Sequence, residues 1–378
     1  MKINIAIVGA GVAGLALAIL ATEHGHNVTV FEQKNTLASI GAGVTLWPNA
    51  TFVLDQLNLL EEVMQISGKP LTMCSIDKYG NAQTLMNIEQ LNKACGYPSL
   101  TILRQDLMRI LYQKAQSLGI KIQFQYPVDK QSLHLFMDQF DLVVGADGRM
   151  RSTTRQLMFG QHYQPQYQGF INIVGTSPLS TQLANTIIEY RGGGQRFGIV
   201  PSHPGTCYWA AAWPEPLNQE KTSVDWATEL THRFKDWPNA IRQAIQSRYL
   251  ADVKPIFLHD LAPLPHWHNK NLLLIGDAAH ASLPTSGQGA CQALEDAWHL
   301  VTVLTHDLPL KKALKAFYQR RIEKTTAAQA AGRHIAAQTF SSDDTEMVNR
   351  TLPDTNQLSQ FWMQGLTSDP AVYQPHLE

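Results

Sequence analysis

The stretch that decides the fold is Ile3-Asn-Ile-Ala-Ile-Val-Gly9-Ala-Gly11-Val-Ala-Gly14, followed by an apolar run to Thr22 and then Asn27-Val-Thr-Val-Phe-Glu32. The β-branched residues before the glycines predict a buried strand, and the apolar run predicts a helix. Gly9 permits a tight turn, Gly11 lets a pyrophosphate approach the backbone, and Gly14 lets the helix pack closely on the strand. Glu32 ends the second strand, where a carboxylate can accept a hydrogen bond from a ribose hydroxyl. The stretch therefore predicts a dinucleotide-binding βαβ unit.

Two other interpretations of this stretch have to be weighed. The first is a βαβ unit whose glycines are incidental. The second is a signal peptide or a membrane span, because residues 5–21 are almost all apolar. The glycines within the run and the lack of a small-residue cleavage site argue against the second interpretation.

The composition narrows the class of protein. The chain has 378 residues, which suffices for one large domain or two interlocked domains. Its formal net charge is −1 at pH 7, so nothing favours nucleic acid or an anionic membrane as a partner. The four cysteines are scattered and form no C-x-x-C pair, which favours reduced thiols in the cytoplasm and no metal site.

Two regions of the chain have the sequence pattern of short antiparallel strands. Gly80-Asn81 predicts a hairpin turn between strands at 71–78 and 82–86. Further short strands are expected between residues 167 and 213, with helices near 223–234 and 238–247. The fold class is therefore α/β. It has a Rossmann-like dinucleotide domain interleaved with a mainly antiparallel β-sheet substrate domain. We assign 1–70, 98–160 and 268–310 to the first, 71–97 and 161–267 to the second, and 311–378 to C-terminal helices.

Two further motifs lie far from the first. Asp147-Gly148 follows a short buried strand, and Ser152 after it is a typical helix N-cap. Gly276-Asp277-Ala-Ala-His280 also follows a buried strand, which would deliver Asp277 to the carboxyl edge of the sheet, where ligands bind. The Gly287-Gln-Gly289-Ala290 turn then opens a helix whose N–H groups can face an electron-rich ring.

These three motifs in this order resemble the FAD-dependent aromatic hydroxylases. These are single-component flavin monooxygenases of the p-hydroxybenzoate hydroxylase type, and the closest branch is that of the salicylate and urate hydroxylases. The segment Gly41–Asn49 and Arg104 also match, so the resemblance spans residues 3–305. It implies FAD as cofactor, NADPH or NADH as reductant and O2 as oxidant. The expected reaction is hydroxylation of a small aromatic or heteroaromatic compound through a flavin C4a-hydroperoxide.

The resemblance also implies roles for individual residues. FAD would contact Gly9, Gly11, Ala13 and Gly14 near the pyrophosphate, Glu32 and Gln33 near the adenosine ribose, Thr45 beside the flavin, Arg104 at the phosphates or ribityl chain, Val128 near the adenine, Asp147 on the pyrophosphate side, Asp277 at the ribityl chain, and Gly289 and Ala290 at the isoalloxazine. Pro284, Gly287 and Gly289 belong to the loop over the reacting part of the ring. His280 is expected to make a structural hydrogen bond to this loop rather than to act as a base.

The substrate residues are less well defined by the sequence. Arg191 or Arg196 could pair with a substrate carboxylate, or either could lie on a surface hairpin. Trp209 and Trp213 lie four residues apart on one strand and therefore on one face. Core packing is the default for this pair, and lining of the substrate pocket is the alternative.

Two departures from the family pattern stand out. The family reads D-G-x-x-S-x-x-R, whereas this chain has one more residue between Gly148 and Ser152. The segment from Ile120 to Asp141 is also short, and of the family's usual hairpin little more than 132–135 would remain.

Other activities on the same fold remain open. They are a xenobiotic- or antibiotic-inactivating monooxygenase acting on a tetracycline-like compound, a halogenase, a dehydrogenase or reductase, and an FAD-binding protein without turnover. The W-x-W-x-I-P motif of halogenases is absent. The expected partners are a small-molecule substrate and O2, without nucleic acid or a membrane span, in a monomer or homodimer.

Overall fold

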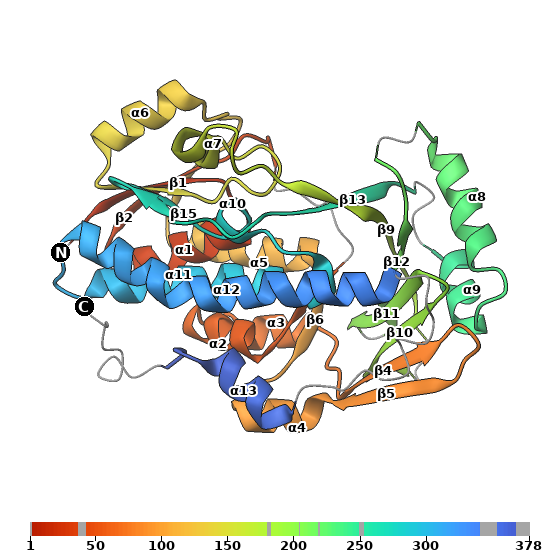
Figure 1. The fold of residues 1–378 in the computed structure, drawn as a ribbon. Helices are drawn as coiled ribbons and strands as arrows, with labels where there is room; N and C mark the ends of the chain where they lie inside the picture. The colour runs from red at the N-terminus through yellow and green to blue at the C-terminus, as the bar shows by residue number, and fades with distance from the viewer. Residues whose placement is uncertain are drawn as a thin grey trace.

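The computed structural model describes residues 2–36, 43–179, 183–203, 205–217, 220–248, 253–340 and 354–367. Two large β-sheets organise this part of the chain, and a long helix runs across both (Figure 1). Gly41, and residues 341–353 and 368–378 of the segment assigned to C-terminal helices, lie outside the described residues.

The first sheet has six strands in the order β14-β15-β8-β1-β2-β7. Its strands are β1 (Asn4–Val8), β2 (Asn27–Phe31), β7 (Lys121–Gln123), β8 (Leu142–Gly145), β14 (His268–Asn269) and β15 (Leu272–Leu274). All neighbours pair in parallel except β14 with β15, and β1 lies between β2 and β8. The β-branched run before Gly9 is thus the buried centre of a Rossmann-like sheet, as the sequence predicts.

Helices cover both faces of this sheet (Figure 1). On one face lie α1 (Val12–Glu23), α5 (Arg104–Ser117) and α11 (Gly289–Thr305), and on the other α6 (Lys130–Gln139) and α7 (Thr153–Phe159). Ten consecutive residues of α1, Val12 to Ala21, are buried, which explains why this helix is apolar all round. The segment where little more than a remnant of a hairpin was expected is the helix α6. Asp129 caps its N-terminus, and Leu133 and Phe136 bury its inner face.

The second sheet has seven strands in the order β13-β9-β12-β11-β10-β4-β5. They are β4 (Thr72–Asp77), β5 (Ala82–Asn87), β9 (Gln166–Pro178), β10 (Thr186–Gly192), β11 (Gln195–His203), β12 (Thr206–Pro214) and β13 (Pro255–Asp260). Only β10 and β4 pair in parallel, so the sheet is mainly antiparallel and the predicted hairpin forms its edge. One face packs against α8 (Ser223–Arg233) and α9 (Asn239–Gln246) in a second hydrophobic core.

Smaller elements connect the two sheets. The strands β3 (Gly43–Leu46) and β6 (Leu100–Leu103) form a two-stranded antiparallel pair, and α2 (Pro48–Gln56), α3 (Leu60–Ile66) and α4 (Ile88–Cys95) lie close to them. Pro48 occupies the first turn of α2, where a proline is well accommodated. The long helix is α12 (Leu310–Phe340), and α13 (Thr355–Met363) packs on α2 and α4.

Candidate active site

The glycine turn between β1 and α1 has the shape that a phosphate-binding turn requires. Gly9 has φ +108°, and a Cβ there would lie 2.3 Å from the carbonyl oxygen of Ala146. A Cβ on Gly14 would lie 2.0 Å from the carbonyl oxygen of Gly9, whereas nothing lies within 4 Å of a Cβ on Gly11. The helix α1 begins without a side-chain cap and without an acidic residue in its first turn. Its free N–H groups therefore open onto space beside Gly11, which fits a pyrophosphate.

The residues predicted at the adenosine end lie beside this turn. The Glu32 carboxylate accepts hydrogen bonds from the backbone N–H groups of Ala10 and Lys34, each at 2.9 Å. Gln33 follows on the exposed bend, and Val128 packs against the apolar cluster that contains Phe31. Glu32 is thus held at the edge of the glycine turn by backbone donors.

Asp147 organises the turn after β8. Its carboxylate accepts hydrogen bonds from the Ser152 hydroxyl at 2.7 Å and from the N–H and hydroxyl of Thr154 at 3.0 and 2.7 Å. Burial raises the pKa of Asp147, although these hydrogen bonds act in the opposite direction. Ser152 also caps α7 by accepting from Arg155 N–H, as predicted. The carboxylate therefore stabilises its own loop.

Asp277 comes directly after Gly276, at the carboxyl end of the first sheet. Gly276 has φ +58°, and a Cβ there would lie 3.0 Å from the Cβ of Ala13 in α1. The Asp277 side chain is 40% exposed and pairs with Arg149, with 3.2 Å between Nη2 and Oδ2. Burial alone would raise the pKa of Asp277, but the nearby positive charges of Arg149 and Arg104 lower it. The structure therefore brings Gly276, Ala13, Arg104 and Asp277 to one edge of the sheet.

The loop from Pro284 to Ala290 lies between α12 and Trp47. Pro284 begins a short 3-10 turn, and Gly287 has φ +64°, where a Cβ would lie 2.9 Å from Nε1 of Trp47. The Thr285 hydroxyl donates to the carbonyl of Gly332 in α12 at 2.6 Å. Gly289 is the first residue of α11, so its N–H points out of the helix N-terminus.

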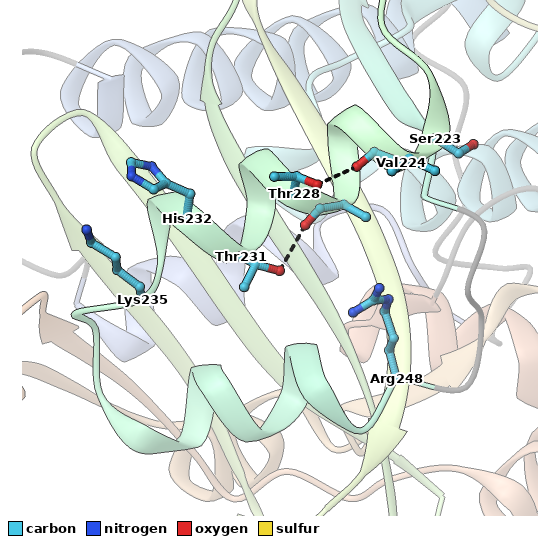
Figure 2. Close-up of a pocket in the computed structure, with 8 residues that line it drawn as sticks. Ser223, Val224, Thr228, Thr231, His232, Lys235 and Arg248 are labelled. Carbon is cyan, nitrogen blue, oxygen red and sulfur yellow. Dashed lines mark hydrogen bonds between the residues drawn. The ribbon is translucent and has the colours of Figure 1, made fainter.

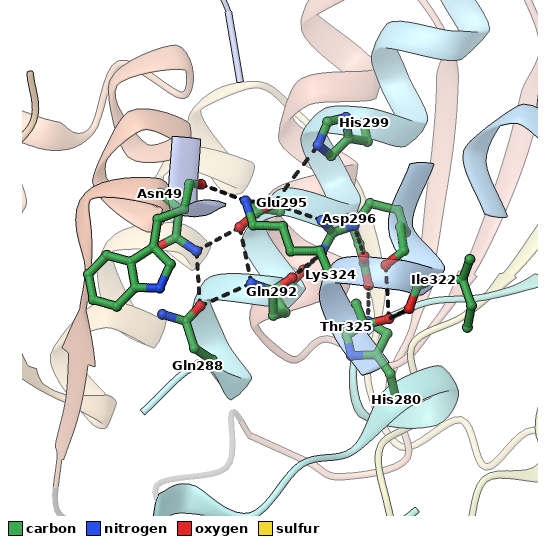
Figure 3. Close-up of polar contacts among 12 residues, drawn as sticks. Asn49, His280, Gln288, Gln292, Glu295, Asp296, His299, Ile322, Lys324 and Thr325 are labelled. Atoms are coloured by element: carbon green, nitrogen blue, oxygen red, sulfur yellow. Dashed lines mark hydrogen bonds and ion pairs between the residues drawn. The ribbon is translucent and has the colours of Figure 1, made fainter. Parts of the chain in front are cut away.

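A buried network of charged and amide side chains from α11 and α12 contacts the end of this loop (Figure 3). Arg321 of α12 donates to Glu295 at 2.7 Å and to Asp296 at 2.8 Å, and all three side chains are fully buried. Arg321 also donates to Oε1 of Gln292, whose Nε2 donates to Oε1 of Gln288 at 3.0 Å. The network thus connects α12 to the residue immediately before Gly289.

His280 and Asn49 extend this network at its two ends. His280 hydrogen-bonds Asp296 of α11 at 2.6 Å, so its partner lies in the helix and not in the loop that the sequence predicted. Asn49 of α2 donates to Glu295 at 2.6 Å and to Gln288 at 3.0 Å. The segment containing Trp47 and the loop containing Gly287 are therefore held in one hydrogen-bonded unit.

One face of the second sheet is directed toward this region, and Tyr208 identifies which face. Its ring packs on the backbone of Gly43, where a Cβ would lie 2.2 Å from Cδ1. Its hydroxyl lies 3.1 Å from the hydroxyl of Thr45, and burial raises the pKa of Tyr208 to about 12. Since directly paired residues in an antiparallel ladder point to the same side, the strand register gives the other members of this face. They are Asn172, Val174 and Thr176 on β9, Ala210 and Ala212 on β12, Arg196, Gly198 and Val200 on β11, and Glu189 and Arg191 on β10.

We call this set, including Tyr208, the inner face. Its centre consists of small residues, Gly198 and Ala210. A Cβ on Gly198 would meet no atom closer than 3.6 Å. At one side, Oδ1 of Asn172 is buried without a hydrogen-bond partner among the described residues. The inner face therefore carries small residues in the middle and polar side chains at its edges.

Arg191 and Arg196 lie on this face rather than on a surface hairpin. Arg191 is buried and Arg196 is partly buried, and both form ion pairs with the buried carboxylate of Glu189. Burial would raise the pKa of Glu189, but the two arginines hold it far below its usual value. Since two positive charges share one negative charge, the trio carries a net charge of +1.

Trp209 and Trp213 lie on one face, as expected, and this is the opposite face of the sheet. Both are fully buried in the core under α8 and α9, where Trp209 stacks on Phe197 and Trp213 contacts Phe234. Their indole N–H groups donate to Ser177 and Glu215, at 2.9 and 3.1 Å. This environment corresponds to core packing and leaves pocket lining without support, because the alternation along β12 directs these side chains away from Tyr208.

A separate shallow pocket lies on the outer side of α8 and α9 (Figure 2). The hydroxyls of Thr228 and Thr231 point back to backbone carbonyls of their own helix, at 2.8 and 2.9 Å. Because these groups are already paired and the pocket lies on the far side of the second core, it is not part of the candidate active site.

Comparison with known proteins agrees with this architecture. Residues 2–134 and 139–331 match the family model described as FAD binding domain. The aurachin C monooxygenase/isomerase of Stigmatella aurantiaca is 30% identical over 342 residues, with 88% of each chain covered. The chain belongs to the FAD-dependent monooxygenases. An FAD-dependent urate hydroxylase of Mycolicibacterium vanbaalenii is 25% identical to the present chain, with 90% of this chain and 89% of the relative covered.

Solved structures show the same fold for the monooxygenase. A variant of HpxO from Klebsiella pneumoniae, crystallised with FAD, superposes with a TM-score of 0.82 at 20% identity, covering 97% of this chain and 98% of the other. This similarity confirms the fold class inferred from the sequence, and the match to the FAD binding domain model confirms the FAD cofactor. No helix among the described residues is long and apolar enough to cross a membrane.

Sequence reasoning missed several residues of this site. Tyr208 and Glu189 gave no local signal, because their position depends on the pairing of strands that are far apart in the chain. Asn49 and Gln288 are joined across 239 residues, and no spacing rule predicts that contact. Arg149 belongs to the segment between Gly148 and Ser152 that is one residue longer than in the family, but its partner Asp277 is 128 residues away.

Proposed function

We propose that this monooxygenase uses NADH or NADPH and O2 to hydroxylate a small, flat aromatic or heteroaromatic compound bound on the inner face of the second sheet. The observation that carries the proposal is the contact of Tyr208 with Gly43 and Thr45, which brings the inner face onto the segment expected to line the flavin. Bound FAD would supply the reduction of oxygen and the transfer of one oxygen atom.

The residues predicted for FAD fit this arrangement. The open space beside Gly11 and the uncapped start of α1 suit a pyrophosphate, and Asp277 suits the hydroxyls of the ribityl chain. Gly289 at the N-terminus of α11 would place backbone N–H groups against the ring end that accumulates negative charge. The network behind Gln288 would keep this terminus in place.

The inner face supports a substrate of a particular kind. Gly198 and Ala210 project little from the sheet, so a planar ring would lie flat on them and the sheet would exclude water from one side of it. The net positive charge near Arg191 and Arg196 would attract an anionic or electron-rich substituent. Asn172 offers an unpaired acceptor for an N–H or O–H group of the substrate.

The experiment that tests this proposal enlarges a side chain at the centre of the inner face. A Cβ on Gly198 would meet no atom closer than 3.6 Å, so Gly198→Val should leave folding and FAD binding unchanged. Stimulation of NADPH or NADH oxidation would be measured with a panel of phenols, salicylates, nicotinates, purines and tetracyclines. The variant should lose at least about tenfold in kcat/KM for every compound that the wild type accepts.

Ala82→Val on the exposed edge strand β5 is the matched control, because it adds the same branching to the same sheet away from the inner face. It should behave like the wild type. A Gly198→Val enzyme with unchanged kcat/KM would show that the substrate binds elsewhere.

A further inference from the structure

The turn between β8 and α7 contains the extra residue and keeps the hydrogen bonds of its motif. Ser152 donates to Asp147 and caps α7. The additional length is accommodated in the turn after Gly148, which has φ +82°. This turn therefore presents a side chain, Arg149, that the rest of the motif does not require.

A buried guanidinium fixes the backbone from which Arg149 projects. Arg155 is fully buried and donates to the carbonyl of Arg149 at 2.5 Å and to the carbonyl of Ala278 at 3.1 Å. It thus joins the extended turn to the helix that begins at Asp277. Since both carbonyls are held by one rigid group, the distance between the two segments is fixed.

The guanidinium of Arg149 is itself held at two points. Nη1 donates to the carbonyl of His259 at 2.7 Å, and Nη2 lies 3.2 Å from Oδ2 of Asp277. Among the described residues, Oδ1 of Asp277 has no hydrogen-bond partner, and the side chain is 40% exposed. One oxygen of the carboxylate is therefore held in place while the other stays available to a ligand.

We infer that Arg149 is a positioning residue for FAD, acting through Asp277. By holding Oδ2 it aims Oδ1 at a hydroxyl of the ribityl chain. By its charge it offsets the repulsion between the carboxylate and the two negative charges of the pyrophosphate. This inference rests on the binding of FAD by the family and on the proposed contact of Asp277 with the cofactor.

The inference predicts a change in cofactor affinity and in its pH dependence. Arg149→Met should weaken FAD binding to the apoprotein about tenfold, measured by quenching of FAD fluorescence. Without Arg149 the pKa of Asp277 should rise, so the carboxylate should be protonated at a higher pH. As the pH is lowered, the FAD affinity of the variant should therefore begin to fall earlier than that of the wild type. Arg149→Lys keeps the charge but loses the second contact and should lie between the two.

A double-mutant cycle separates this role from a general loss of stability. If Arg149 acts through Asp277, Arg149→Met should have little further effect in an Asp277→Asn background. Arg151→Ala, an exposed arginine in the same turn, is the control and should bind FAD within about twofold of the wild type. Unchanged FAD affinity in Arg149→Met, or equal losses in both backgrounds, would overturn the inference.

The outcome is independent of the proposed substrate. Tight FAD binding by Arg149→Met would reject the inference and leave the hydroxylase proposal standing. If instead the wild-type protein bound no FAD, the shared foundation of both would fail. If Arg149→Met did not fold, as judged by circular dichroism, Arg149→Lys would decide the question alone, because it retains the charge.

Discussion

Replacing Glu189 by glutamine should both weaken the fold and change the charge that a substrate meets. Glu189 is 6% exposed and is the carboxylate shared by Arg191 and Arg196. Removing its charge leaves the buried Arg191 and the partly buried Arg196 without this counter-ion, and loss of one partner of a buried ion pair typically costs about 3–5 kcal/mol in the free energy of unfolding. The same change raises the net charge of the trio from +1 to +2.

The size of the effect can be read against a matched control. Glu89 also forms an ion pair with a basic side chain, Lys93 at 2.8 Å, but it is 53% exposed. Glu89→Gln should therefore cost no more than about 0.5 kcal/mol. Urea unfolding followed by tryptophan fluorescence suits both variants, because the tryptophans Trp209 and Trp213 lie on the same sheet as Glu189.

The pH dependence follows from the direction of the pKa shift. The pKa of Glu189 in the folded protein is far below its unfolded value of about 4.3. The contribution of Glu189 to stability is therefore fully present at pH 7. It is lost as the pH falls from the unfolded pKa toward the folded pKa. Glu189→Gln should accordingly show a flatter acid-side stability profile than the wild type.

A second measurement on the same variant addresses function. With the extra positive charge, Glu189→Gln should bind salicylate more tightly relative to phenol than the wild type does. A variant within about 0.5 kcal/mol of wild-type stability would refute the reasoning about the buried trio. An unchanged preference between the two ligands would refute the placement of the trio at the substrate site.

Three other predictions concern the cofactor turn, the buried network and a thiol. Gly14→Ala puts a Cβ 2.0 Å from the carbonyl oxygen of Gly9 and should reduce FAD affinity at least about tenfold, measured by fluorescence titration. Gly11→Ala should keep the fold intact, because nothing lies within 4 Å of a Cβ at that position. Arg321→Met removes the arginine that Glu295 and Asp296 share in the buried network and should lower stability by about 3–5 kcal/mol, whereas the exposed Lys315→Met should cause no measurable loss. Equal midpoints of thermal unfolding would contradict this. Burial raises the pKa of Cys291 to about 12, so mass spectrometry should find this cysteine unmodified by iodoacetamide at pH 8 in the folded protein, and rapid labelling there would disagree with the structure.

The sequence predicted what depends on neighbours along the chain. Gly9, Gly14 and Ser152 could be assigned because a turn, a close approach and an N-cap each need a particular residue within a few positions. The hairpin at Gly80 was predicted for the same reason.

What the sequence left open depends on pairing between distant segments. The common face of Trp209 and Trp213 follows from their spacing, but which face of the sheet turns toward the cofactor depends on how β12 packs between its neighbours and α8. Likewise, Arg191 and Arg196 could be singled out, but their sharing of Glu189 follows from the register of β10 and β11. The individual site assignments and the domain boundaries remain predictions.

The most direct test of the central claim is the fate of the oxygen atoms. The FAD-loaded protein would be supplied with NADPH or NADH, a compound from the panel that stimulates its oxidation, and molecular oxygen labelled with oxygen-18. The account predicts that the product carries one labelled oxygen atom in a new hydroxyl group. A product that is oxidised but carries no labelled oxygen would contradict it and assign the protein to the dehydrogenases of this fold.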